Sequence, residues 1–161
     1  MRDTWKSVVL AATAITLSGM LILPFSSSPV SAAGFSAEVE QALETSTYAY
    51  IASERKSGEL GTPAEIWYMS HAGAVWVGTP KATYRAKRIL AGRTKAHVAL
   101  GKKDGPAFDA KGSIVTDPKL NEVLFEALAK KYPSGWKSFE SGFRDGFKDG
   151  SRVLIKYEPV E

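Results

Sequence analysis

The sequence VWVGTPKATYRAKR, residues 75–88, decides the fold of this chain. In its first five residues, apolar or β-branched side chains alternate with Trp76 and Gly78, which is the pattern of a β-strand. Gly78-Thr79-Pro80 then breaks the strand, and residues 83–91 have the composition of a short helix that Thr83 can cap. We therefore expect a strand, a tight turn and a short helix in direct succession.

The turn and the first helical turn carry hydroxyl groups and cations that suit a phosphate group. A helix start exposes unpaired N–H groups and the positive end of the helix dipole, and arginine adds a planar pair of donors. The alternative is a basic helix whose charges are simply solvated. On the phosphate interpretation, the candidate ligand-binding residues are Thr79, Lys81, Thr83, Arg85, Lys87 and Arg88.

The run GTPKATYRAKRIL, followed by GRTKAHVAL, resembles the pyridoxamine 5'-phosphate oxidase-like split-barrel family. It is most similar to the branch of flavin- and deazaflavin-dependent oxidoreductases, in which a strand ending in threonine precedes a Ser-x-Lys-x-x-Arg-like turn. Thr83 takes the serine place, Arg85 the lysine place and Arg88 the later basic place. Arginine instead of lysine at 85 departs from that pattern. The resemblance covers residues 47–159 and rests on the order of several weak motifs.

Short strands and turns are expected on both sides of this stretch. Strands are predicted over residues 48–54, 60–69, 95–101, 108–115 and 152–157, and helices over residues 35–44 and from residue 118 to a stop at Pro133-Ser134-Gly135. Many strands with short hairpin links argue against a parallel βαβ sheet. We expect one mainly β (α+β) domain over residues 34–161, an antiparallel split β-barrel of the FMN-binding type with two or three peripheral helices.

Residues 142–150 repeat the unit G-F-x-D-G twice, in a loop or a short helix. Phe139, Phe143 and Phe147 are spaced by four residues, so a helix would place them on one face that packs on the barrel or on a partner. A calcium loop fits poorly, because the ligand spacing and the terminal glutamate of such loops are missing.

Residues 1–33 have the features of a Sec-type signal peptide. A short positive segment with Arg2 and Lys6 precedes the apolar residues 8–23, and small residues around Ser31 suit cleavage. The alternative is a retained membrane anchor, although the apolar run is short for a span. We therefore expect an exported protein, periplasmic or secreted, that contacts a membrane only if this segment is retained.

Composition excludes several kinds of chemistry. The chain of 161 residues has no cysteine, which rules out disulfides and thiolate chemistry, and its net charge of +4 is a mild excess. There is no G-x-S-x-G nucleophile motif, and no pair of carboxylates is marked for glycoside hydrolysis. Residues 81–103 are basic but match no nucleic-acid-binding module, so we expect no nucleic-acid partner. No metal site is expected.

The family resemblance implies a cofactor, either FMN or deazaflavin. It places the cofactor phosphate beside Thr79, Thr83, Arg85 and Arg88, and the ring along residues 65–69 and 75–79 at the interface of a homodimer. Trp136 and Phe139 of the partner subunit would complete the pocket. From composition, the candidates for an apolar ring slot are Ile66, Trp67, Tyr68 and Trp76, whose alternative role is core or interface packing. The residues assigned to cofactor binding are Trp67, Tyr68, Thr79, Thr83, Arg85, Lys87 and Arg88.

Three functions remain open at this point. The first is a flavin- or deazaflavin-dependent oxidoreductase that acts on a small molecule. The second is a non-catalytic barrel that stores or senses a flavin, haem or tetrapyrrole, with His71 or His97 as the alternative haem ligand. The third is a structural or interaction protein that has lost the cofactor site. No catalytic side chain is identified, because in a flavoenzyme the cofactor carries the redox step.

Overall fold

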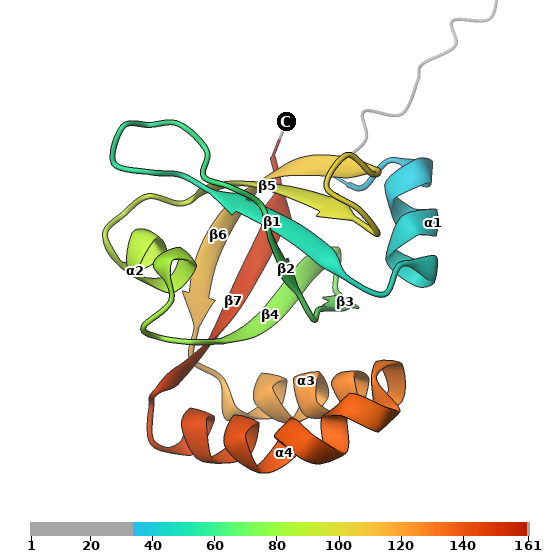
Figure 1. Ribbon diagram of the computed structural model, residues 1–161, viewed down its shortest axis with the longest axis vertical. Coiled ribbons are helices and arrows are strands. Elements are labelled where there is room, and N and C mark those ends of the chain that lie inside the picture. Colours follow the sequence, from blue (N-terminus) through green and yellow to red (C-terminus); the bar gives the residue numbers. More distant parts are fainter. Residues whose placement is uncertain (1–33, 161) are drawn as a thin grey trace, which may run out of the picture. The chain divides into compact units, whose positions relative to one another are not determined.

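The computed structural model describes residues 34–160, so the predicted leader, residues 1–33, lies outside the described residues. Figure 1 shows a curled antiparallel sheet with helices packed around it. The strands are β1 (Ala49–Ser53), β2 (Ala64–Ile66), β3 (Met69–His71), β4 (Ala74–Pro80), β5 (Lys95–Leu100), β6 (Ala107–Val115) and β7 (Arg152–Pro159). The helices are α1 (Ala37–Thr45), α2 (Tyr84–Leu90), α3 (Pro118–Lys131) and α4 (Pro133–Lys148).

The sheet closes on itself because its two edge strands are neighbours in the sequence. The strand order is β2-β1-β5-β6-β7-β4-β3, and every pair is antiparallel. Only Trp67 and Tyr68 separate β2 from β3, so the first and last strands of the sheet must meet in space. No ladder of hydrogen bonds joins β2 to β3 or β4 among the described residues. The result is an antiparallel barrel with a split between β2 and β4, as the sequence predicts.

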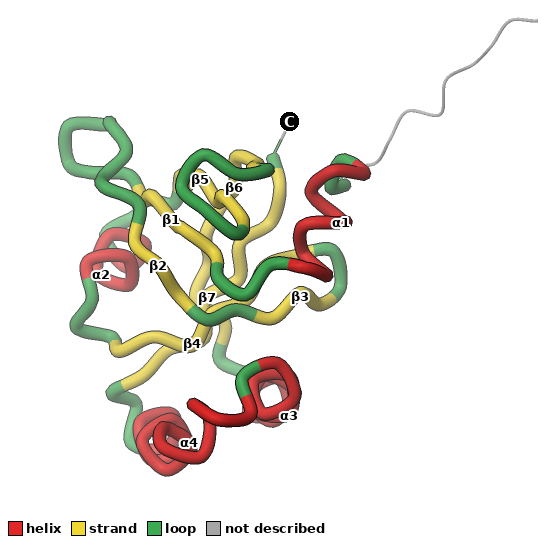
Figure 2. Tube along the Cα trace, turned by 45° about the vertical axis from the view of Figure 1, so that its right-hand side comes forward, coloured by secondary structure: helices red, strands yellow, loops and turns green. Residues whose placement is uncertain are grey.

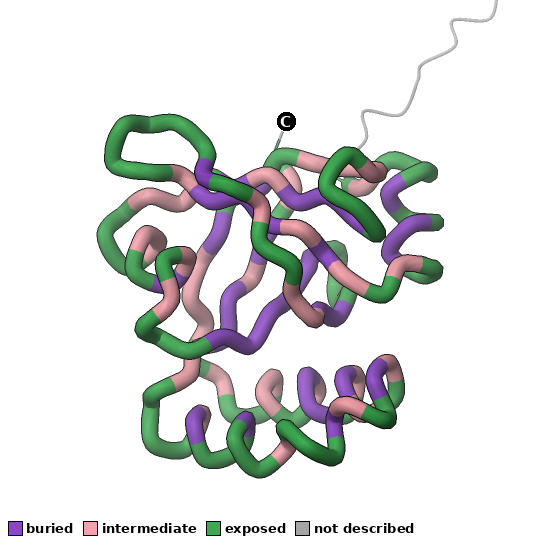
Figure 3. The backbone as a smooth tube through the Cα atoms, viewed as in Figure 1, coloured by how far each residue is buried: buried purple, intermediate pink, exposed green. Residues whose placement is uncertain are grey.

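Two hydrophobic clusters lie on opposite faces of β4 and β7. One fills the barrel and includes Val77, Val98 and Ile155, which are fully buried. The other lies between the sheet and the helices α3 and α4, which Figure 2 shows side by side, and includes Leu124 and Leu154. Figure 3 shows the buried residues concentrated in the strands and on the inner helix faces. Asp117 caps the start of α3, because its Oδ1 accepts from Lys119 N at 2.9 Å.

Two predictions about secondary structure are wrong. The strand expected over residues 60–69 is two short strands, because the chain turns from one sheet edge to the other at Trp67 and Tyr68. The stop expected at residues 133–135 is the start of α4, since proline is tolerated in the first helical turn. Gly135 is needed there, because a Cβ at this position would lie 2.6 Å from the Trp67 ring.

The phenylalanine repeat therefore lies in a long helix rather than a loop, and the described residues contain four helices rather than two or three. Phe143 is buried against the barrel, as the spacing by four residues predicts. Phe139 is 54% exposed, so the phenylalanine face is only partly covered within the chain.

Candidate functional site

The split of the barrel leaves part of β4 without a partner strand. On one side β4 pairs with β7 from Val75 to Pro80, but on the other it pairs with β3 only from Ala74 to Trp76. Residues 77–79 therefore present backbone donors and acceptors to the split. An unpaired strand edge readily accepts a ligand or another strand. Two cavities lie near the split: residues 78–80 of β4 line one of them, and both have a residue of β2 in their lining.

The first cavity, which we call the arginine cavity, has a volume of about 570 Å³ and lies between β1, β2 and α2. Three arginines and four hydroxyl groups line it, and no carboxylate of residues 34–160 does. Its polar lining residues are Ser53, Arg55, Thr62, Thr83, Arg85 and Arg88, with Tyr84 beside them. A cavity with this composition suits an anion, and arginine forks match the oxygen geometry of phosphate in particular.

Arg88 is fixed in the wall of this cavity. Its Nη1 donates to the carbonyl and to the Oγ of Ser53, both at 2.9 Å. Gly61 allows this approach, because a Cβ there would lie 2.8 Å from the same nitrogen. Arg88 therefore joins α2 to β1, and its positive charge is held in a fixed position.

Arg85 is different, because part of its guanidinium is buried without a partner. Among residues 34–160, its enclosed Nη1 has no hydrogen-bond partner, and the nearby buried hydroxyl of Tyr157 has none either. Burial lowers the pKa of Arg85 and raises the pKa of Tyr157 to about 12, so the tyrosine stays neutral and cannot balance the charge. An unpaired buried donor costs stability and is uncommon in folded proteins. Because Arg85 also lines the arginine cavity, an anion bound there would balance the charge of its guanidinium.

The second cavity, which we call the aromatic cavity, has a volume of about 460 Å³ and lies between β2, β4 and α4. Trp67 forms one wall: its ring is stacked on Tyr132, with centroids 4.5 Å apart, and meets Phe139 edge to face at 5.6 Å. Aromatic walls of this kind suit a planar ring. The full lining is Tyr48, Glu65, Ile66, Trp67, Gly78, Thr79, Pro80, Phe139, Phe143 and Arg152.

The two cavities meet at β2 and at a pair of threonines. Ala64 lines the arginine cavity and the next residue, Glu65, lines the aromatic cavity. Thr79 of the aromatic cavity and Thr83 of the arginine cavity share a hydrogen bond of 3.3 Å between their Oγ1 atoms. Thr83 precedes α2 as expected, but its hydroxyl makes this contact and no capping bond. One ligand can therefore place an anionic group in one cavity and a ring near the other.

The structure brings five of the seven predicted site residues to these cavities: Trp67, Thr79, Thr83, Arg85 and Arg88. The other two lie elsewhere. Tyr68 is fully buried in the barrel, where its hydroxyl donates to the carbonyls of Leu43 and Ser46. Lys87 is exposed on α2 and lines neither cavity.

The remaining candidates for the ring slot divide in the same way. Ile66 lines the aromatic cavity, and Phe139 reaches it from the same chain rather than from a partner. Trp136 is buried between the helices and packs on Phe143. Trp76 is buried as well, with its Nε1 donating to the carbonyl of His71 at 2.8 Å.

Neither histidine lines the arginine or the aromatic cavity. His71 lies in the β3–β4 hairpin beside Trp76, and His97 lies on β5 with its Nδ1 2.8 Å from Asp109 Oδ1. Among residues 34–160, no group of three or more histidine, cysteine, aspartate or glutamate side chains is close enough to hold a metal ion. In the same part of the chain, no helix has both the length and the apolar character needed to cross a membrane.

Sequence reasoning missed the side of the site that comes from distant elements. Ser53, Arg55 and Thr62 belong to β1 and the loop after it, and Arg152 opens β7. None of them stands in a motif with residues 75–88. A cross-sheet pairing would have been needed to find them, such as the register of Pro80 with Arg152.

No protein-family model and no curated protein matches the sequence. Solved structures do match the fold. The heme storage protein HutZ from Vibrio cholerae matches with a TM-score of 0.56 and 12% identity over 80% of this chain and 92% of that one.

Two further structures match over similar lengths. A Clostridium acetobutylicum protein related to general stress protein 26, of the pyridoxinephosphate oxidase family, has a TM-score of 0.53 and 14% identity over 76% of this chain and 81% of its own. An F420 reductase has a TM-score of 0.50 and 18% identity over 76% of this chain and 93% of its own. The chain therefore has the split-barrel fold of the pyridoxamine 5'-phosphate oxidase-like proteins.

Proposed function

We propose that this chain binds FMN or a phosphate-bearing deazaflavin at the split of the barrel, and that it is an oxidoreductase acting on a small molecule. The observation that carries the proposal is a cavity lined by three arginines and no carboxylate, in which the charge of Arg85 has no ion-pair partner among residues 34–160. A phosphate in this cavity would supply the missing negative charge.

The residues at the split fit such a cofactor. Arg55, Arg85 and Arg88 would hold the phosphate, with Thr83 at the junction of the cavities. The free edge of β4 and the aromatic cavity would then receive the ring and the small molecule that reacts with it. When bound, the cofactor supplies the electron transfer, while the chain supplies position, electrostatics and exclusion of water.

Haem is a weaker candidate for these cavities, because neither His71 nor His97 lines them. A neighbour of the same fold is named as a heme storage protein, so haem stays among the cofactors to be tested. A barrel that had lost its cofactor site would have no need of three arginines around one cavity without a carboxylate.

The test is retention of a chromophore by the full-length chain, purified in mild detergent. The chain is incubated separately with FMN, deazaflavin and haem, desalted, and measured by absorbance. We expect flavin-type bands in the wild type, loss of them in Arg85→Gln and Arg88→Gln, and no change in the matched control Lys87→Gln on the exposed side of α2. Flavin bands that survive both arginine substitutions would refute the proposed site. A flavin that no reductant or substrate alters would support the non-catalytic alternative.

We propose further that the chain is exported through residues 1–33 and that it forms a homodimer. Export is supported by the sequence pattern of the leader, and dimerisation by the half-exposed Phe139 at the mouth of the aromatic cavity. Cell fractionation with mass determination tests the first: a processed chain outside the cytoplasm is expected, and an unprocessed cytoplasmic chain would contradict it. Light scattering tests the second, with a monomer as the contrary result.

A further inference from the structure

Among residues 34–160, Arg152 is the one cationic side chain that lines the aromatic cavity, and three residues of α4 contact it. Its Nε donates to the carbonyl of Gly142 at 3.1 Å. Its guanidinium carbon lies 4.1 Å from the centre of the Phe143 ring, so the planar cation rests on an aromatic face. Its aliphatic stem crosses α4 at Gly146, where a Cβ would lie 2.7 Å from Cγ and 2.8 Å from Cδ.

These contacts account for Phe143 and Gly146 in the first G-F-x-D-G unit of the sequence. Gly142 supplies a carbonyl, Phe143 a ring and Gly146 the space for the stem, and each of them serves the same arginine. Glycine inside a helix costs about 1 kcal/mol relative to alanine, so two glycines four residues apart need a compensating role. At Gly146 that role is the passage of the Arg152 side chain.

The cation held in this way has no counter-charge. No salt bridge of Arg152 occurs among residues 34–160, and burial lowers its pKa. Glu65, the one carboxylate of the aromatic cavity, accepts instead from the hydroxyl of Tyr50 at 2.5 Å. A guanidinium that is fixed at Nε keeps its Nη groups for a second partner.

We propose that Arg152 binds the carboxylate of the substrate, and that the substrate is a planar aromatic or conjugated acid whose ring lies among Trp67, Phe139 and Phe143. The inference rests on the proposed function, since it takes the aromatic cavity as the place where the substrate meets the cofactor. It goes further by assigning a charge and a shape to that substrate. Arg152 is then a specificity-determining residue that contacts substrate.

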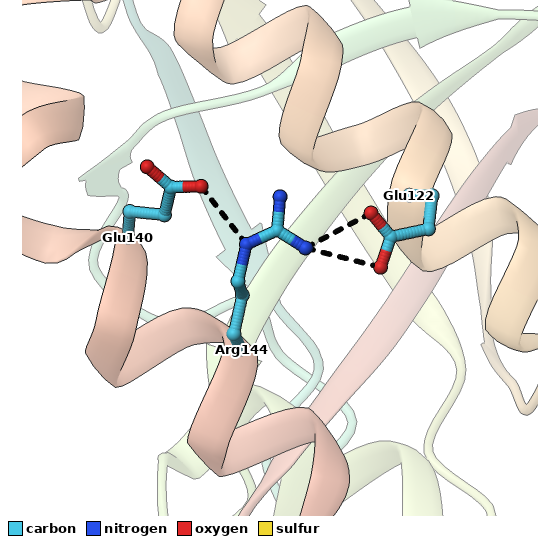
Figure 4. A network of polar contacts seen from close by, with 3 residues as sticks. All are labelled: Glu122, Glu140 and Arg144. Carbon is cyan, nitrogen blue, oxygen red and sulfur yellow. Dashed lines mark hydrogen bonds and ion pairs between the residues drawn. The ribbon is translucent and has the colours of Figure 1, made fainter.

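Arg144 provides a contrast on the same helix. It also lies over a phenylalanine ring, with its guanidinium carbon 4.7 Å from the centre of Phe125. Figure 4 shows its guanidinium paired with Glu122 and Glu140, at distances of 2.9 Å each. Arg144 therefore has its anions within the chain, whereas Arg152 has no ion-pair partner in the part of the chain that the structure describes.

The experiment is calorimetric titration of the full-length chain, without added cofactor, with benzoate and with its neutral analogue benzamide. The indole N–H signal of Trp67, assigned with Trp67→Phe, reports whether the probe enters the aromatic cavity. We expect benzoate to bind more tightly than benzamide, and Arg152→Gln to weaken benzoate about tenfold or more while leaving benzamide unchanged. Arg144→Gln is the matched control and should leave both affinities unchanged.

A pair of glycine variants tests whether α4 positions Arg152, without removing any charge. Gly146→Ala should weaken benzoate in the same direction as Arg152→Gln, because its methyl group displaces the arginine stem. Gly142→Ala should not, since a Cβ there meets nothing within 4 Å. Both substitutions raise helix propensity equally, so circular dichroism should show that both fold.

Three results would overturn the inference. Equal affinities for benzoate and benzamide would show that the negative charge of the ligand does not matter. Equal affinities of Gly142→Ala and Gly146→Ala for benzoate would show that the passage of the Arg152 stem over Gly146 does not matter. Arg152 also borders a neighbouring cavity of about 330 Å³ together with Lys81. Benzoate binding that depends on Lys81→Gln and leaves the Trp67 signal unmoved would place the anion there instead. The proposed function is tested by chromophore retention in the Arg85 and Arg88 variants, whereas this titration uses no cofactor. The failure of one can therefore be told from the failure of the other.

Discussion

Replacing Arg85 by methionine separates the effect of this residue on the stability of the cofactor-free protein from its effect on cofactor binding. Methionine keeps an unbranched apolar stem and removes the enclosed Nη1 that has no partner. Leaving a buried donor unpaired costs about 1–3 kcal/mol, so the cofactor-free variant should be more stable than the wild type by about that amount. For a domain of this size each kcal/mol corresponds to about 4 °C in melting temperature.

The cofactor should reverse this order. A ligand at 1,000 times its dissociation constant stabilises the native state by about 4 kcal/mol. The wild type should gain this amount from FMN, and Arg85→Met should gain almost none because it lacks the phosphate contact. The assay is urea unfolding followed by tryptophan fluorescence, with and without FMN, for both chains.

Arg88→Met provides the control, since Nη1 of Arg88 is hydrogen-bonded to Ser53. Loss of its two bonds to Ser53 should destabilise the cofactor-free protein by about 1–3 kcal/mol, opposite in sign to Arg85→Met. If Arg85→Met destabilised the cofactor-free protein by more than about 1 kcal/mol, the account of Arg85 as an unpaired, ligand-seeking group would be refuted.

Three more predictions follow from buried contacts. Tyr132→Phe should destabilise the protein by about 2–4 kcal/mol in urea unfolding, because its hydroxyl joins the carbonyl of Thr47 at 2.6 Å and the amide of Tyr68 at 3.1 Å; an effect under about 0.5 kcal/mol would contradict this. Burial lowers the pKa of Lys131 from 10.5 to about 8. Between these two pH values the unfolded chain binds more protons than the folded chain, so the free energy of unfolding should rise with pH. Lys131→Met should flatten that rise, and an unchanged slope would exclude Lys131 as its source. Gly78→Ala should cost about 1–3 kcal/mol in thermal unfolding, since its methyl group would meet three side chains of α3 and α4 within 3.2 Å; a neutral variant would show that the helices shift freely.

Much of the fold could be predicted because its signals are local. Alternation located the strands, and Asp117 before Pro118 located the start of α3, since the cap and the proline act within one turn. The interruption at Trp67 and Tyr68 could not be predicted, because it depends on the closure of the sheet, which brings its two edges together. The start of α4 was missed because Pro133 and Gly135 are read as a stop, while Gly135 is there to admit the Trp67 ring.

The candidate site could be predicted only where it lies along one stretch of chain. Thr79, Thr83, Arg85 and Arg88 follow one another closely, and the structure brings them to one junction. Lys87 looks the same in sequence but lies on the outer side of α2, because the helical turn, rather than composition, decides which side chain faces the cavity. Arg152 and Ser53 come from strands far away in the sequence, so only the barrel closure shows that they belong to the site.

The measurement that tests the central claim most directly is a calorimetric comparison of FMN with riboflavin, which has the same ring and no phosphate. If the arginine cavity binds the phosphate, FMN should bind at least about 100-fold more tightly than riboflavin, because several charge-assisted hydrogen bonds are at stake. The difference should disappear in Arg85→Met. Equal affinities for FMN and riboflavin, or no binding of either, would contradict the assignment of the arginine cavity as a cofactor phosphate site.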